Sequence, residues 1–208
     1  MVEFRFNHQI AELVYDLRRS KYRDVLIEIA DRADVISKQV DGPGAGLIRG
    51  TLIDMTMSEL IQSLDEFQSC HQGQSDLMAF GHEYSWKALT GKKGQIALFW
   101  SKNGDDAPIP KFDRHIIILV LQEGRWYDAK YANRRKQGPV EGPIIKRGIY
   151  VCDMDHANEH VQIGSNNKTD ALVDEYNLHA MLEQALFNDW FVSLPQRKRY
   201  DKFSLVFY

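Results

Sequence analysis

The chain has 208 residues, of which 44% are hydrophobic and 26% are charged, and its formal net charge is -3. This composition is ordinary for a globular protein with a core of its own, and the near-neutral charge argues against a dedicated nucleic-acid binder. Two cysteines do not make a disulfide framework, and the longest apolar run, 116–121, is far too short to cross a bilayer. We therefore expect one cytoplasmic domain over 1–208, with no membrane partner and no cofactor.

The first half of the chain has helical spacing. Apolar residues recur every three or four positions in 10–17 and again in 25–36, which predicts two helices. The glycine- and proline-rich stretch 41–46 predicts a turn or exposed loop, because both residues oppose helix continuation. Thr56 and Glu59 fit a capping box, so a third helix is expected from there toward Phe67. A helical lobe over 1–68 is the one subdivision that the sequence suggests.

The second half mixes strands and helices. Leu77, Phe80, Tyr84 and Leu89 are spaced for another helix, ending near Gly91. Strands are expected over 95–101, 144–145, 148–152 and 203–208, and a β-hairpin is expected from 115–121 and 125–131. The region 170–190 predicts a long helix. The fold class is therefore α+β, with a helical N-terminal portion packed on a central, mostly antiparallel sheet and one long C-terminal helix.

One group of residues could carry chemistry: Cys70, His115 and Asp128. A catalytic thiol needs a lowered pKa, a base and a group that orients the base. Ser69 and Gln72 fit a capping box that would place Cys70 in the first turn of a helix. His115 and Asp128 would lie on the two strands of the predicted hairpin, where their side chains could meet. The alternative for Cys70 is a buried, small apolar residue.

This order resembles the papain-like fold, and its transglutaminase-like branch most of all, over residues 69–131. The resemblance is carried by Cys70 before a helix, His115 at the start of a strand, and Trp126 shortly before Asp128. It implies a cysteine-dependent hydrolase or acyltransferase that acts on a peptide or carboxamide bond through a thioester. Cys70 would be the nucleophile, His115 the general base and acid, and Asp128 the orienting group; Gln68 is a candidate oxyanion donor.

Other interpretations stay open beside this one. His156 and His160 fit a His-x-x-Glu-His zinc pattern, but a solvated loop fits the segment as well, so no metal is assigned. A basic stretch could contact nucleic acid, although the net charge disfavours such a partner; its residues are Arg134, Arg135 and Lys136. A non-enzymatic protein that binds or inhibits a protein or peptide partner requires no motif at all. The sequence does not indicate an oligomeric state.

Overall fold

The structure is a computed structural model that describes residues 8–69, 76–90, 96–99, 115–124, 144–153, 161–163, 170–173 and 175–197. Three helices come first: α1 (His8–Leu17), α2 (Ser20–Gln39) and α3 (Ala45–Ile61). The strands β1 (Phe67–Ser69), β2 (Leu77–Ala79), β3 (His82–Leu89), β4 (Ile96–Phe99) and β5 (His115–Val120) follow. The chain continues with β6 (Gly148–Cys152), β7 (Val161–Ile163), β8 (Asp170–Val173), α6 (Glu175–Phe187) and β9 (Phe191–Ser193).

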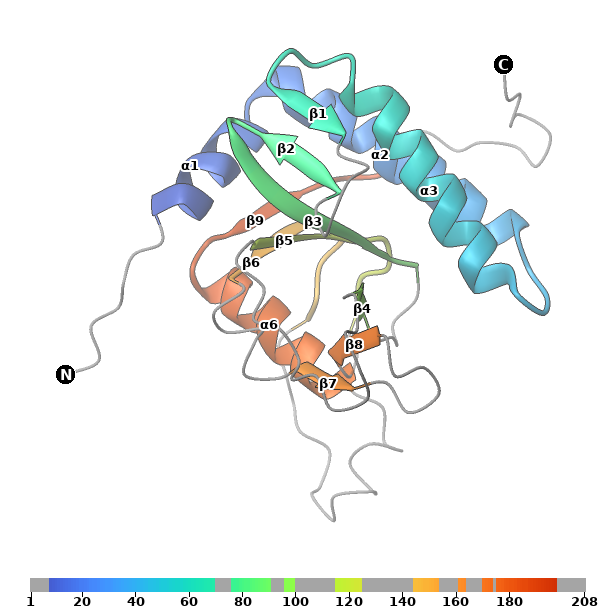
Figure 1. Ribbon diagram of the computed structural model, residues 1–208. Coiled ribbons are helices and arrows are strands. Elements are labelled where there is room, and N and C mark those ends of the chain that lie inside the picture. The colour runs from blue at the N-terminus through green and yellow to red at the C-terminus, as the bar shows by residue number, and fades with distance from the viewer. Residues whose placement is uncertain are drawn as a thin grey trace.

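The main sheet has six strands in the order β1-β2-β3-β5-β6-β9, and a second sheet has the order β4-β8-β7. In the main sheet β3 and β5 run parallel and the other neighbours are antiparallel. Figure 1 shows α2 and α3 on one side of this sheet and α6 on the other. The predicted mixed α+β class with a mostly antiparallel sheet is therefore confirmed.

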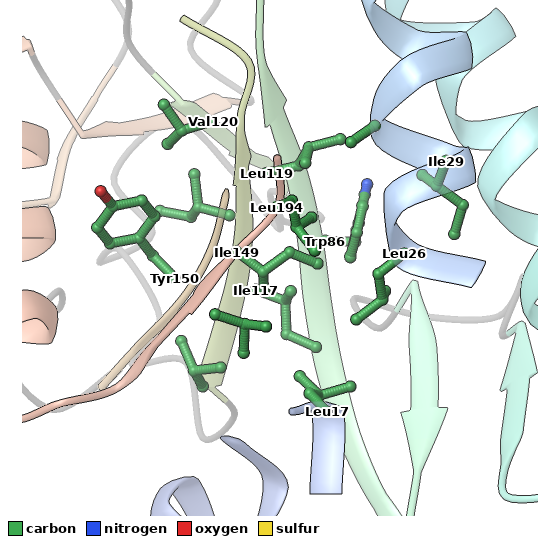
Figure 2. Packing of buried hydrophobic residues seen from close by; sticks show 14 of the residues in the cluster. Leu17, Leu26, Ile29, Trp86, Ile117, Leu119, Val120, Ile149, Tyr150 and Leu194 are labelled. Atoms are coloured by element: carbon green, nitrogen blue, oxygen red, sulfur yellow. The ribbon is translucent and has the colours of Figure 1, made fainter. Parts of the chain in front are cut away.

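The core forms around β5, the most apolar strand. Ile116 through Val120 are all buried, as expected for a central strand that helices cover on both faces. Figure 2 shows Trp86 between the sheet and α2, near Leu26, whereas Tyr150 points to the opposite side of the sheet. Side chains alternate between the two faces of a strand, so β3, β5 and β6 contribute to both layers of the core.

Four predicted elements differ from the structure. The third helix begins at Ala45, well before the expected start at Thr56. The helix expected over 77–89 is wrong, because Leu77–Ala79 and His82–Leu89 are strands. The long C-terminal helix is shorter than expected, since 170–173 form a strand and α6 begins at Glu175. The expected pairing of 115–121 with 125–131 is also wrong for β5, because β3 and β6 already occupy both of its edges.

None of the helices in the described ranges is both long enough and apolar enough to cross a membrane. Cys152, the cysteine that the described residues contain, is free and buried. Burial raises the pKa of its thiol well above the ordinary range. Cys152 is therefore a core residue and not a nucleophile.

A buried histidine on α6 predicts a loss of stability in mild acid. His179 is 1% exposed, and burial lowers its pKa from 6.5 to about 4, even though its Nδ1 lies 3.1 Å from Oε1 of Glu183. The pKa of His179 is lower in the folded state than in the unfolded state. The neutral imidazole therefore makes its full contribution to stability above pH 6.5, and this contribution is lost as the pH falls toward 4. Between pH 7 and pH 5 we expect the free energy of unfolding to fall by about 2 kcal/mol through this group.

Urea unfolding at the two pH values measures this loss. In a His179→Met variant the difference between pH 7 and pH 5 should shrink by that amount. His82→Ala is the matched control, because His82 is exposed and its removal should leave the difference unchanged. An equal pH dependence in wild type and His179→Met would contradict the assignment.

Candidate active site

The candidate site is built on the hairpin of β2 and β3. Phe80 and Gly81 connect the two strands with φ angles of 51° and 79°, and positive values at both positions are typical of a tight type I′ turn. The strain at Phe80 is offset by aromatic packing, because its ring lies edge-on to Tyr22 and Phe67, at centroid distances of 5.7 and 5.3 Å. The turn fixes a register in which Leu77 pairs with Tyr84.

In this register, the residues of β3 after Tyr84 have no neighbouring strand on the β2 side among the residues that the structure describes. β2 begins at Leu77, opposite Tyr84, whereas β3 continues to Leu89. Asp76 lies at the junction, and its backbone N–H donates to the carbonyl of Tyr84 at 3.0 Å. Its Oδ2 accepts a hydrogen bond from the N–H of Trp86 at 2.8 Å. The Asp76 carboxylate therefore replaces the missing strand and is held in a fixed orientation.

Lys87 brings a positive charge to the same carboxylate. Its Nζ lies 3.4 Å from Oδ2 of Asp76, and its side chain is 23% exposed. Alternation along β3 places Ser85 and Lys87 on one face and Trp86 on the other. Because Trp86 is buried in the core against α2 (Figure 2), it anchors the strand, and Lys87 lies half-buried on the opposite face.

A second carboxylate comes from α3. Asp54 is exposed, but partial desolvation by the protein around its carboxyl group raises its pKa to about 6. The Lys87 ammonium lowers the pKa of Asp54, whereas the negative charge of Asp76 raises this pKa, as desolvation does. Both charges therefore lie within electrostatic range of Asp54. Packing of α3 explains its position, since the neighbouring Ile53 and Met57 are buried against the protein.

Asp54, Asp76 and Lys87 have the composition of a site for a hard divalent cation. Carboxylate oxygens are the ligands that Mg²⁺ prefers, and Mg²⁺ is commonly held by one or two protein carboxylates, with waters and substrate phosphates completing its coordination. The described residues contain no cluster of three or more His, Cys, Asp or Glu side chains that would form a closed metal cage. A carboxylate beside a lysine, with a second carboxylate within electrostatic range, has the chemistry of an open site that an anionic substrate would complete.

The residues predicted from the sequence are placed differently. His115 begins β5 as expected, and its Nδ1 lies 3.6 Å from Oδ1 of Asp153, which follows β6. Gln68 lies on β1 and is exposed. The other predicted residues lie outside the described part of the chain: Cys70, Asp128, Arg134, Arg135, Lys136, His156 and His160. No helix runs through Leu77 and Tyr84, so the helix that Cys70 was expected to begin is absent from 76 onward.

Sequence reasoning missed all three residues of the candidate site. The sequence contains a signal for two of these residues. Asp76 directly precedes a short apolar strand, and Lys87 stands two positions after Ser85, so these two polar side chains share one face of the next strand. Assignment of 77–89 to a helix hid this signal, because a helix would not place Asp76 beside Trp86 and Lys87.

Comparisons with known proteins give one fold similarity. No protein-family model matches the chain, and no curated protein matches it. Among solved structures, the chain is similar to one described as a restriction endonuclease in complex with substrate DNA. The TM-score is 0.51 at 13% sequence identity, over 82% of this chain and 84% of the other.

This similarity corrects the earlier interpretation. The fold resembles that of a DNA-acting endonuclease, so the papain-like or transglutaminase-like resemblance is wrong. The similarity also contradicts the cysteine hydrolase or acyltransferase function inferred from Cys70, His115 and Asp128. It contradicts as well the expectation that nucleic acid is a disfavoured partner. The chain thus has a fold similar to that of a restriction endonuclease, with Asp76 beside Lys87 of β3 and Asp54 of α3 within electrostatic range of both.

Proposed function

We propose that this protein is a nuclease that hydrolyses phosphodiester bonds in DNA with the help of a divalent metal ion, at Asp54, Asp76 and Lys87. One observation carries the proposal: Asp76, at the end of the β2–β3 hairpin, lies 3.4 Å from Nζ of Lys87, and Asp54 on α3 lies within electrostatic range of both charges. The similarity in fold to a restriction endonuclease in complex with substrate DNA supports DNA as the substrate class.

The proposed roles follow from the chemistry of phosphodiester hydrolysis. A divalent metal ion bound by the carboxylates would polarise the phosphoryl oxygens and lower the pKa of a bound water. Asp54 and Asp76 would hold that ion, and the N–H of Trp86 keeps the Asp76 carboxylate in place. Lys87 supplies a fixed positive charge for the negative charge that develops on the phosphoryl oxygens. Its Nζ already lies beside Asp76, so no large movement is required.

The reaction balances with water as the only co-reactant. The oxygen of a water molecule forms a new bond to phosphorus, and one phosphorus–ester oxygen bond breaks. The products are a phosphate monoester and an alcohol. The proton that the attacking water loses balances the proton that the leaving alkoxide gains, so no redox step is needed.

Cleavage of DNA by the purified protein tests this function. We expect supercoiled plasmid to be nicked or linearised in Mg²⁺ or Mn²⁺ and to stay intact in EDTA. Lys87→Met should lower the rate at least about 100-fold, because it removes the charge but keeps a side chain of similar length. Thermal unfolding of the variant checks that the fold is retained.

A matched variant purified in the same way shows whether a contaminating nuclease causes the cleavage. Lys38→Met removes a lysine that pairs with Asp34 on α2, away from the site, and should leave cleavage unchanged. If the folded wild-type protein fails to cleave DNA in either metal, or if Lys87→Met cleaves as fast as wild type, the proposed function is wrong.

A further inference from the structure

A cavity of about 520 Å³ lies between α1 and the β2–β3 hairpin. Figure 1 shows α1 beside the turn that joins the two strands. The floor of the cavity is apolar, because Leu13 and Tyr84 are buried and the half-buried Phe80 comes from the turn. Sites for small molecules usually have a volume of about 300–1,000 Å³ and a mainly apolar lining. The cavity therefore has the size and the floor of such a site.

The polar rim of the cavity comes mainly from one side of α1. His8, Glu12 and Asp16 are four positions apart and so share one side of the helix, and Tyr15 lies next to them. The hairpin contributes His82, which is exposed. The rim thus combines two carboxylates with exposed rings, above an aromatic floor.

Contacts across the cavity connect its two walls. Nε2 of Gln9 on α1 donates to the hydroxyl oxygen of Tyr84 on β3 at 3.4 Å. Burial raises the pKa of Tyr84, and the negative charge of Glu12 raises it further. The Glu12 carboxylate is therefore within electrostatic range of the Tyr84 hydroxyl, although the two residues come from different walls.

We propose that this cavity binds a small organic cation, with an ammonium, guanidinium or amidinium group on an apolar body. The lining residues that the structure describes include two carboxylates and neither lysine nor arginine. A carboxylate forms strong, charge-assisted hydrogen bonds with such a cationic group. The rings of Tyr15 and Phe80 would add cation–π attraction, and the apolar floor would take up the body of the ligand.

The ion pairs that the two carboxylates already form leave them available to a ligand. Oε1 of Glu12 lies 3.0 Å from Nε2 of His8, and Oδ1 of Asp16 lies 3.2 Å from the guanidinium of Arg19. The side chains of His8 and Arg19 are exposed, and exposed ion pairs contribute little to stability. A cation held against the apolar floor is screened less by water, so its attraction to the carboxylates is stronger.

The cavity is separate from the candidate active site. Side chains alternate along β3, so Tyr84 lies at the cavity, whereas Ser85 and Lys87 lie on the other face of the strand. The carboxylates of the rim would repel the phosphates of DNA, which disfavours the cavity as part of a DNA-binding surface. The inference therefore does not depend on the proposed nuclease function, and binding can be measured without DNA.

Isothermal titration calorimetry of the full chain tests the proposal with three cations: benzamidine, agmatine and spermidine. Measurements at pH 8 are suitable, because imidazole groups are generally neutral there. We expect at least one cation to bind with a Kd below about 1 mM, and benzamide, the uncharged analogue of benzamidine, to bind at least about tenfold more weakly than benzamidine. Glu12→Gln should weaken the binding of any bound cation at least about tenfold, since it removes the charge and keeps the size.

The matched control is Asp65→Asn, which removes an exposed carboxylate that does not line the cavity and should bind the cation as wild type does. Tyr15→Leu should weaken binding about threefold, because it removes a ring and keeps an apolar side chain. Thermal unfolding checks that each variant is folded.

Three results would overturn the proposal. The first is a folded wild-type protein that binds none of the three cations with a Kd below about 1 mM. The second is benzamide binding as tightly as benzamidine, and the third is a Glu12→Gln protein that binds the cation as tightly as wild type. A lysine-rich peptide that binds when the small cations do not would mark the cavity as a protein contact, which also contradicts a small-molecule site.

Discussion

Asp76→Asn is expected to lower the rate of DNA cleavage by about 1,000-fold or more while the protein stays folded. Asparagine keeps an oxygen that can accept the hydrogen bond from the N–H of Trp86, so the end of the hairpin remains satisfied. It removes the negative charge that would hold a divalent cation. Loss of a metal ligand affects polarisation of the phosphoryl group and activation of water together, so the effect on rate should exceed that of Lys87→Met.

Single-turnover cleavage rates measure this effect, with thermal unfolding in parallel. The matched control is Asp65→Asn, because the Asp65 side chain is 94% exposed and lies 3.8 Å from Lys21, in the turn before β1. This variant should cleave at the wild-type rate. A folded Asp76→Asn protein that retains more than about a tenth of the wild-type rate would remove Asp76 from the site.

Arg147→Met is expected to destabilise the fold by about 3–5 kcal/mol. The Arg147 guanidinium lies 3.0 Å from Oδ1 of Asp31, and the two side chains are 13% and 0% exposed. It also donates to the backbone oxygens of Leu121 and Leu194 at 3.2 and 3.1 Å. This cluster joins α2 to the main sheet and to the segment after β9. Removal of the arginine takes the guanidinium away from a buried carboxylate that keeps a hydrogen bond from the backbone N–H of Arg197 at 3.2 Å, and loss of one charged member is the costly case for a buried ion pair.

Urea unfolding of Arg147→Met and of its neighbour variant Lys146→Met measures the difference at pH 7. Lys146→Met should change stability by less than about 0.5 kcal/mol, as is usual for surface substitutions. Because the penalty arises from a buried negative charge that loses its guanidinium, the double variant Arg147→Met with Asp31→Leu should recover part of the loss. An Arg147→Met protein within 1 kcal/mol of wild type, on the scale of a typical surface pair, would contradict a structural role.

The fold class could be predicted from the sequence because hydrophobic spacing is a local signal. The periodic apolar residues of 10–17 and 25–36 lie on α1 and α2, and the β-branched run after His115 forms β5. The start of α3 was missed, since Gly46 and Gly50 argue against a helix. The helix forms nevertheless, because Ile53, Met57 and Ile61 are buried against the protein, and tertiary packing outweighs the local preference.

The hairpin of β2 and β3 shows why the candidate site was not predicted. Leu77, Phe80 and Tyr84 satisfy helical spacing by chance, and Phe80 carries no turn preference that would reveal its positive φ. The register that brings Asp76 to Trp86 depends on that turn. Asp54 adds a contribution from a helix more than twenty residues earlier, which local patterns cannot place beside Lys87.

The most direct test of the account is a crystal structure of the protein with Mn²⁺ and a short DNA duplex. We expect an anomalous peak for the metal within about 2.0–2.3 Å of oxygens of both Asp54 and Asp76, the range for small divalent cations with oxygen ligands. A phosphodiester group of the duplex should lie between that metal and Nζ of Lys87. Metal bound elsewhere on the protein, or DNA bound across a different face, would contradict the assignment of this site.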